Sequence, residues 1–205
     1  MCDRRKSHSM TDDAHATTGS ECHVDPGATV GYEHAPDARP THIGDRATIR
    51  AGTIVYADVA IGDDFTTGHN ALIREDTAID DDVLVGTDVT IDGTTTIGTH
   101  VSLQTGVYVP THTEIGNQVF VGPRAVLTND PYPVRRESDL AGPTLEDHVS
   151  VGANATLLPG ITVGRGSFVA AGAVVAENVP PETLAVGVPA RHEPLPDELA
   201  GENAI

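Results

Sequence analysis

The chain has few of the residues that build an ordinary globular core. Its 205 residues include no tryptophan and only three phenylalanines, and aromatic residues make up 3% of the composition. Large aromatic side chains usually dominate protein cores because each buries a large apolar area. The fold is therefore expected to be one that packs without them.

Features of secreted and membrane-inserted proteins are also missing. The only cysteines, Cys2 and Cys22, lie in a polar N-terminal stretch, which indicates no disulfide framework and fits a reducing compartment. No apolar run approaches the roughly 20 residues that cross a bilayer, and the polar N-terminus is unlike a signal peptide. We expect a cytoplasmic protein without membrane insertion.

Positive charge is scarce. Lys6 is the only lysine, the formal net charge is −18, and 19 of the 30 acidic residues are aspartate. Nucleic-acid-binding proteins need basic patches, so nucleic acid is excluded as an expected partner. Dense surface carboxylates keep a chain solvated, and this composition is typical of halophilic proteins.

What the chain does have is an aliphatic residue at every sixth position. From Ile43 to Leu127 in steps of six, fourteen of fifteen positions are Ile, Val or Leu, and Thr67 is the exception. The series resumes in phase from Leu145 to Val175. Hexapeptide repeats signal a parallel β-helix, in which three hexads close a triangular coil and aliphatic residues fill its interior. The sequence predicts an all-β prism roughly 35 Å long, because neighbouring coils stack about 4.8 Å apart. A β-sandwich would not keep this phase.

The remaining segments are predicted around the prism. Residues 1–22 are polar and aperiodic, which indicates a disordered leader. Residues 23–180 form the β-helix, and the spacing of thirteen from Val30 to Ile43 indicates a bulging loop with one extra residue. Residues 128–144 break the hexads with three prolines, which predicts a loop that replaces or projects from a coil. Residues 181–205 form a C-terminal extension with an acidic tail.

The loop at 128–144 is the first candidate for function, because it interrupts a strict repeat. It contains Arg135 and Arg136, and Arg124 lies just before it. Guanidinium groups suit phosphates and carboxylates, so we expect these arginines to contact a substrate. Charge balance against neighbouring acids is the alternative.

Stacking gives further candidates on the acceptor side. Residues eighteen apart should lie above one another, which places Gln104 in a column otherwise made of glycine, beside Thr105. A glycine-lined channel could hold a flat nucleotide, and Gln104 could donate a hydrogen bond to a sugar. A solvated glutamine on a turn is the alternative.

Four segments in order, "VFVGPRAVLTNDPYPVRR", "VSVGANATLLPGITVG", "VAAGAVVAENVP" and "AVGVPAR", resemble the signatures of nucleotide-linked sugar acetyltransferases. The chain thus resembles the hexapeptide acyltransferases, and among them it most resembles enzymes that N-acetylate 3-amino sugars on nucleotide carriers. The resemblance covers roughly residues 43–192. It implies a left-handed parallel β-helix and an acetyl-CoA-dependent N-acetyltransferase of surface glycan or glycoprotein synthesis, acting on a nucleotide-linked amino sugar.

The resemblance also implies a homotrimer of parallel prisms with active sites between neighbouring chains. Acetyl-CoA would lie along the C-terminal coils, where small residues let its pantetheine arm approach the backbone. The positions that match are Gly152, Ala153, Ala171, Pro189 and Arg191. Small residues also suit tight turns, which is the structural alternative.

The candidate catalytic residues come from a position at which this chain differs from its O-acetylating relatives. The O-acetylating relatives carry a catalytic histidine just after the hexad at Leu127, whereas this chain has Asn129 and Asp130. A hydroxyl acceptor needs a general base, but a neutral amine is already nucleophilic. Asn129 would then orient the thioester or sugar, and Asp130, with Glu75 or His69, would accept the proton. A capping turn is the alternative for Asn129 and Asp130.

Three other functions remain open. One is O-acetyl transfer to a sugar. Another is a hydratase like the γ-class carbonic anhydrases, which bind zinc through three histidines across a subunit interface; the chain lacks their histidine pair spaced five apart, so we expect no metal. The last is a non-catalytic prism, for which Thr94–Thr96 is a weak indication that Asp76 and Asp130 interrupt.

Overall fold

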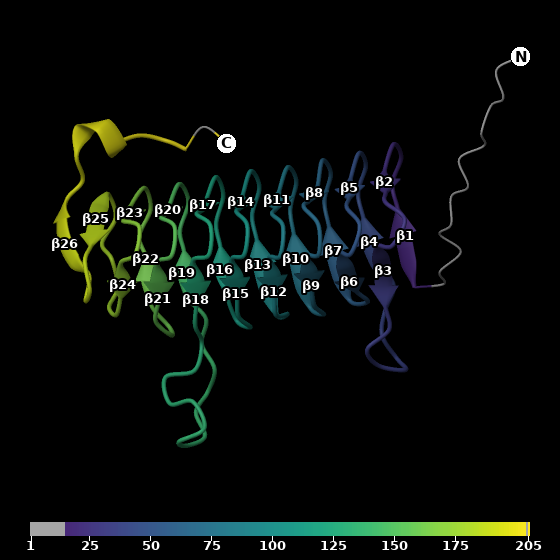
Figure 1. The fold of residues 1–205 in the computed structure, drawn as a ribbon, viewed down its shortest axis with the longest axis horizontal. Helices are drawn as coiled ribbons and strands as arrows, with labels where there is room; N and C mark the ends of the chain where they lie inside the picture. Colours follow the sequence, from purple (N-terminus) through teal and green to yellow (C-terminus); the bar gives the residue numbers. More distant parts are fainter. Residues whose placement is uncertain (1–14, 204) are drawn as a thin grey trace, which may run out of the picture.

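The computed structural model describes residues 15–203 and residue 205. Within these residues the chain forms short parallel strands that wind into a three-sided prism, with one sheet on each side (Figure 1). The fold is the left-handed parallel β-helix that the sequence predicted. Sheet A contains, in order along the prism, β1 (Ala16–Thr18), β4 (Thr41–Ile43), β7 (Val59–Ile61), β10 (Thr77–Ile79), β13 (Thr95–Ile97), β16 (Glu114–Ile115), β19 (Thr144–Leu145) and β22 (Thr162–Val163).

The other two sheets run alongside. Sheet B contains β2 (His23–Val24), β5 (Thr48–Ile49), β8 (Thr66–Thr67), β11 (Leu84–Val85), β14 (Ser102–Leu103), β17 (Phe120–Val121), β20 (Ser150–Val151), β23 (Phe168–Val169), β25 (Thr183–Val186) and the antiparallel β26 (Arg191–Pro194). Sheet C contains β3 (Thr29–Tyr32), β6 (Ile54–Tyr56), β9 (Leu72–Ile73), β12 (Thr90–Ile91), β15 (Tyr108–Val109), β18 (Val126–Leu127), β21 (Thr156–Leu157) and β24 (Val174–Val175).

The hexad residues form the core. Ile49, Ile73 and Ile91 are completely buried, as is Phe65, the largest buried side chain. Thr67, the one polar residue of the series, is also buried and accepts a 2.9 Å hydrogen bond from the Arg50 amide. Because its hydroxyl is satisfied there, threonine is tolerated in the apolar interior.

The corners of the prism are made by left-handed turn residues. Asp58, Asp76 and Asn70 have φ between 55° and 61°, a region that aspartate and asparagine tolerate better than most residues. His100, His112 and His148 occupy equivalent positions with φ between 55° and 62°. The histidines therefore take part in the turn geometry of the repeat.

The loop between β18 and β19 projects from the prism and does not replace a coil. Leu84 of β11 pairs with Ser102 of β14, eighteen residues on, whereas Glu114 of β16 pairs with Thr144 of β19, thirty residues on. Twelve residues are thus inserted at one corner. Figure 1 shows this loop leaving the prism on the same side as the loop between β3 and β4.

The loop between β3 and β4 corrects a second expectation. Val30 of β3 pairs with Val55 of β6, twenty-five residues on, so seven residues are inserted and not one. The insertion is anchored by Arg39, whose Nε donates to Asp58 Oδ1 at 2.6 Å.

The predicted prism, residues 23–180, is too short at both ends. β1 pairs in parallel with β4, so the first coil begins at Ala16 and not at residue 23. Cys22 packs against the core, and its thiol donates to the carbonyl oxygen of Gly44 at 3.1 Å. Residues 15–22 are therefore part of the prism and not of the disordered leader predicted at residues 1–22; residues 1–14 of that leader lie outside the described residues.

At the other end, β25 pairs with β23 and extends sheet B beyond residue 180. The chain then turns through β26 and a short 3₁₀ helix, η1 (Asp197–Leu199), and runs back along the prism (Figure 1). Asn203 fixes this return, because its Nδ2 donates to the carbonyl oxygen of Gln118 at 2.9 Å. The described residues contain no helix that is both long and apolar enough to cross a membrane.

Candidate functional site

Apart from Pro189 and Arg191, the predicted site residues lie on two edges of sheet C. The B/C edge is the line of turns that leads from sheet B to sheet C, and the C/A edge is the line that leads from sheet C to sheet A. The B/C edge carries His69, Gln104, Thr105, Arg124, Gly152, Ala153 and Ala171. The C/A edge carries Glu75, Asn129, Asp130, Arg135 and Arg136.

Small residues on the B/C edge are required by the stacking of the coils. A Cβ atom added at Gly122 would lie 2.7 Å from the amide nitrogen of Ala153. A Cβ atom at Gly152 would collide in the same way with the amide of Ala171. The stacking of the coils is therefore a sufficient structural reason for small residues on this edge. The absence of larger side chains also leaves a flat wall beside Ala153 and Ala171.

The polar residues of this edge are exposed or half-buried. Gln104 turns toward sheet B, where its Nε2 donates to Ser102 Oγ at 2.7 Å. His69 is exposed, and its Nδ1 lies 3.3 Å from the carbonyl oxygen of Ala51. Thr105 and Arg124 are exposed on the neighbouring turns.

Pro189 and Arg191 lie at the end of the prism. Pro189 precedes β26, and the next residue, Ala190, donates its amide to the carbonyl oxygen of Val174 at 2.8 Å. This bond holds the pair against β24, in the same coil as Ala171.

Asn129 and Asp130 shape the base of the projecting loop. Asn129 Nδ2 donates to Thr111 Oγ1 at 2.8 Å, one coil away. Asp130 Oδ1 accepts from the Tyr132 amide at 2.8 Å and from Ser138 Oγ at 3.1 Å. The capping function is therefore present, and the bonds to Asp130 leave its Oδ2 unused among the described residues.

The loop arginines are available for a ligand. The guanidinium of Arg136 lies 3.5 Å from the ring centroid of Tyr132, and Arg135 and Arg136 are both exposed. The ion pairs among the described residues use other arginines, namely Arg39, Arg46, Arg50, Arg74 and Arg165. Charge balance with neighbouring acids thus has no support in the contacts of this loop.

Glu75 belongs to a polar network across sheet C. Both of its carboxylate oxygens accept from Arg74, at 2.7 and 3.1 Å, and Arg74 Nη1 also donates to Asp92 at 3.0 Å. Hydrogen bonds to Glu75 and Asp92 raise the pKa of Arg74. Tyr108 donates to Asp92 Oδ2 at 3.1 Å, and burial is the main cause that raises its pKa.

One chain does not bring all the predicted catalytic residues together. His69 is on the B/C edge, whereas Glu75, Asn129 and Asp130 are on the C/A edge. Glu75 and Asn129 share a column but are three coils apart, about 14 Å at the usual strand spacing. Within one chain, only Asn129 and Asp130 are immediate neighbours.

No group of three or more His, Cys, Asp and Glu residues among the described residues has the geometry of a metal site. The expectation that no metal takes part remains a prediction, because a site shared between chains would involve residues of a second copy.

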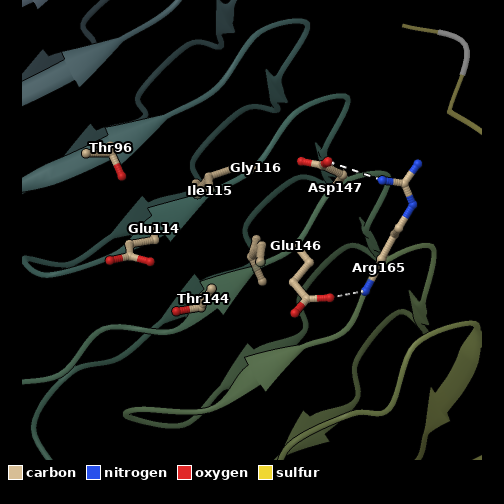
Figure 2. A pocket seen from close by; sticks show the side chains of 9 residues that line it. Thr96, Glu114, Ile115, Gly116, Thr144, Glu146, Asp147 and Arg165 are labelled. Carbon is tan, nitrogen blue, oxygen red and sulfur yellow. Dashed lines mark hydrogen bonds and ion pairs between the residues drawn. The ribbon is translucent and has the colours of Figure 1, made fainter.

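Sequence reasoning did not predict a hollow on sheet A (Figure 2). It has a volume of about 450 Å³, and the side chains that line it include Thr96, Glu114, Thr144, Glu146, Asp147 and Arg165. None of these was a predicted site residue. The signal that could have indicated it is a glutamate in the outward position of a strand of sheet A, where the other strands carry threonine, alanine or, once, histidine.

Two family models match parts of the chain. The model described as "Bacterial transferase hexapeptide (six repeats)" matches residues 142–177, and the one described as "Hexapeptide repeat of succinyl-transferase" matches residues 77–110. Both matches fall inside the prism.

Individual proteins match over longer stretches. A putative acetyltransferase of Schizosaccharomyces pombe is 40% identical over 79 residues, covering 36% of this chain and 38% of that protein. The serine acetyltransferase of Escherichia coli is 40% identical over 88 residues, covering 38% of this chain and 32% of the enzyme. The chain thus spans about a third of the length of these relatives. A crystal structure of a UDP-N-acetylglucosamine acyltransferase from Bacteroides fragilis is 22% identical with a TM-score of 0.63, and covers 84% of this chain and 72% of that one. At this identity the likeness concerns the fold.

Proposed function

Because the chain belongs to the hexapeptide-repeat acyltransferase superfamily, we propose that it is an acetyl-CoA-dependent N-acetyltransferase acting on a nucleotide-linked amino sugar. Similarity to a putative acetyltransferase and to serine acetyltransferase supports acetyl transfer. The pathway served would be the synthesis of surface glycans or glycoproteins, in the cytoplasm.

The projecting loop is the observation that supports a nucleotide-linked sugar as the acceptor. It inserts twelve residues at a corner of an otherwise uniform prism and presents Arg135 and Arg136 to solvent. Two exposed guanidinium groups on an acidic protein suit the diphosphate of a sugar nucleotide, because planar guanidinium groups pair with phosphate oxygens. The tyrosine under Arg136 adds an aromatic surface on which a base could stack.

The co-substrate is assigned to the B/C edge. Gly152, Ala153 and Ala171 form a wall without protruding side chains, which suits the approach of a pantetheine arm to the backbone. Pro189 and Arg191 lie farther along the same end of the prism, where Arg191 would contact the phosphates of the adenosine part.

A homotrimer completes this assignment. The acetyl-CoA wall and the acceptor loop lie on opposite edges of sheet C, so a second chain is needed to bring one of each together. A three-fold arrangement of parallel prisms would form three equivalent clefts, each with the B/C edge of one chain facing the C/A edge of the next.

Chemistry at the cleft would be direct attack of an amine on the thioester. Asn129 would orient the reactants, and Asp130, whose Oδ2 is unused, would accept a proton; Glu75 and His69 are the other candidates. Among the three, Glu75 would first have to leave Arg74.

The test is release of free CoA from acetyl-CoA with a panel of nucleotide-linked sugars. For each carrier, an amino sugar is compared with the corresponding hydroxyl sugar. The proposal expects CoA release with at least one amino sugar and none with its hydroxyl partner. Acetylation of the hydroxyl sugar alone would establish O-acetyl transfer instead.

A further inference from the structure

Glu114 stands apart in the outward column of sheet A. The seven other strands of this sheet are in register with β16, directly or through intervening strands, and their outward residues are small and neutral apart from one histidine. The column consists of Thr17, His42, Ala60, Ala78, Thr96, Glu114, Thr144 and Thr162. Glutamate is among the residues depleted in strands, so its presence here calls for a cause other than strand propensity.

The hollow of Figure 2 surrounds this residue. Thr96, Glu114 and Thr144 lie one below the other on β13, β16 and β19, and Glu146, Asp147 and Arg165 lie on the other side of the hollow. Neither threonine hydroxyl has a hydrogen-bond partner in the described part of the chain. The Glu114 carboxylate is therefore flanked by two free hydroxyl groups.

The two other acids of the hollow are occupied by structural contacts. Glu146 Oε2 accepts from the Arg165 amide at 2.7 Å. Asp147 Oδ1 accepts from the Asn117 amide at 2.8 Å, and Asp147 Oδ2 lies 3.3 Å from Arg165 Nη1. These bonds join successive coils, and the Asn117 amide is the largest influence lowering the pKa of Asp147. Glu114 has no such task, because its carboxylate forms no hydrogen bond or ion pair with any other described residue.

Glu114 also lies beside the point where the projecting loop rejoins the prism. Its amide donates to the carbonyl oxygen of Pro143 at 3.2 Å, and Thr144 is its partner in the next strand. The proposed phosphate-binding arginines belong to that same loop. The loop leads into β19, so a ligand held by the loop would have the unpaired carboxylate of Glu114 on the neighbouring strand, β16.

We propose that Glu114 selects the acceptor by binding its primary ammonium group, with the Thr96 and Thr144 hydroxyls binding hydroxyl groups of the same sugar ring. The inference rests on the proposed function, since it names the group by which that site would distinguish an amino sugar from a hydroxyl sugar. An ammonium donates three hydrogen bonds and carries the opposite charge, whereas a sugar hydroxyl in its place offers one donor and no charge.

Binding without acetyl-CoA tests this separately from catalysis. The probes are 2-, 3- and 4-amino-deoxyglucose and glucose, titrated by saturation-transfer NMR against the wild-type protein and Glu114→Gln. The glutamine keeps the size of the side chain and removes its charge. Glu177→Gln is the matched control, because Glu177 is an exposed carboxylate outside the hollow and its loss changes the net charge equally.

The wild type should bind at least one amino-deoxyglucose about tenfold more tightly than glucose, as expected for one charge-assisted hydrogen-bonded contact. Glu114→Gln should remove that preference and leave glucose binding unchanged, and Glu177→Gln should retain it. A wild type without the preference, or a Glu114→Gln protein that keeps it, would refute the role of Glu114. If the preference depends on Glu114 but no amino sugar nucleotide supports CoA release, the recognition stands and the proposed transfer is wrong.

Discussion

The amide of Ala141 donates a 2.9 Å hydrogen bond to the carbonyl oxygen of Asn129. This bond closes the neck of the projecting loop, so the eleven residues between the two leave and rejoin the prism at one point. Ala141 in turn accepts from the Gly160 amide at 2.8 Å, which continues the ladder into the next coil. The insertion therefore changes one corner of the prism and leaves the stacking on both sides intact.

Asp130→Asn tests the assignment of proton acceptance. The amide oxygen of asparagine can still accept from the Tyr132 amide and from Ser138, so the loop should keep its shape. Loss of a positioned proton acceptor typically lowers the rate by about 10²- to 10⁴-fold. We expect a loss in that range in CoA release, with an unchanged melting temperature. His69→Ala is the parallel variant, and full turnover by both would leave positioning alone to account for catalysis.

The double variant Arg135→Gln and Arg136→Gln tests the acceptor side. Removal of both charges should raise KM for a nucleotide-linked sugar about tenfold or more, since each charged hydrogen bond contributes about 1.5–3 kcal/mol. The value of kcat should change little if the arginines hold only the carrier. Arg46→Gln is the control, because Arg46 pairs with Asp64 at 2.7 Å on another edge. An equal rise in KM for the control would indicate a general charge effect.

The assembly is expected to be a trimer. Light scattering should give a mass three times the 21.3 kDa of one chain, in both low and molar salt. The physical reason is that the two halves of the proposed site lie on opposite edges of sheet C. A monomer that is fully active would contradict the shared site.

Acid should destabilise the prism through its aspartates. Hydrogen bonds from Arg46 are the main cause that lowers the pKa of Asp64, and Arg39 has the same effect on Asp58. A carboxylate with a lowered folded-state pKa stabilises the fold above its unfolded pKa of about 3.9, and this stability is lost as pH falls through the lowered value. Urea unfolding should therefore show a constant midpoint from pH 7 to pH 5 and a falling one below about pH 4. A midpoint that rises on acidification would show that relief of carboxylate repulsion outweighs these bonds.

Phe65→Ala tests the core. Phe65 is fully buried, and truncation of a buried phenylalanine typically costs about 3–5 kcal/mol. Urea unfolding at fixed protein concentration should show a loss of that size. Tyr132→Ala is the matched aromatic control, because Tyr132 is 42% exposed and should cost less than about 1 kcal/mol. A small loss at Phe65 would mean that the aliphatic ladder collapses into the space.

The repeat by itself determined the coil. A period of six with an aliphatic residue at each step allows one packing, in which Ile49, Ile73 and Ile91 face inward and the following residues turn a corner. The place in the hexad also determines polar turn residues: His100, His112 and His148 each lie three residues after a hexad aliphatic, and all three have left-handed backbone geometry. These properties are local, because a residue's position within its own hexad decides whether it faces the core.

Only the tertiary structure decided how coils are joined across an interruption. An insertion of twelve residues is two hexads long, so the periodicity is the same whether the loop replaces a coil or projects from it. The pairing of Glu114 with Thr144 settles this. The first coil was missed for a related reason, since β1 lies at the end of sheet A, pairs only with β4 and lacks a long aliphatic series. The surroundings of Glu114 come from residues eighteen before it and thirty after it, and contacts at those separations exist only once the coils have stacked.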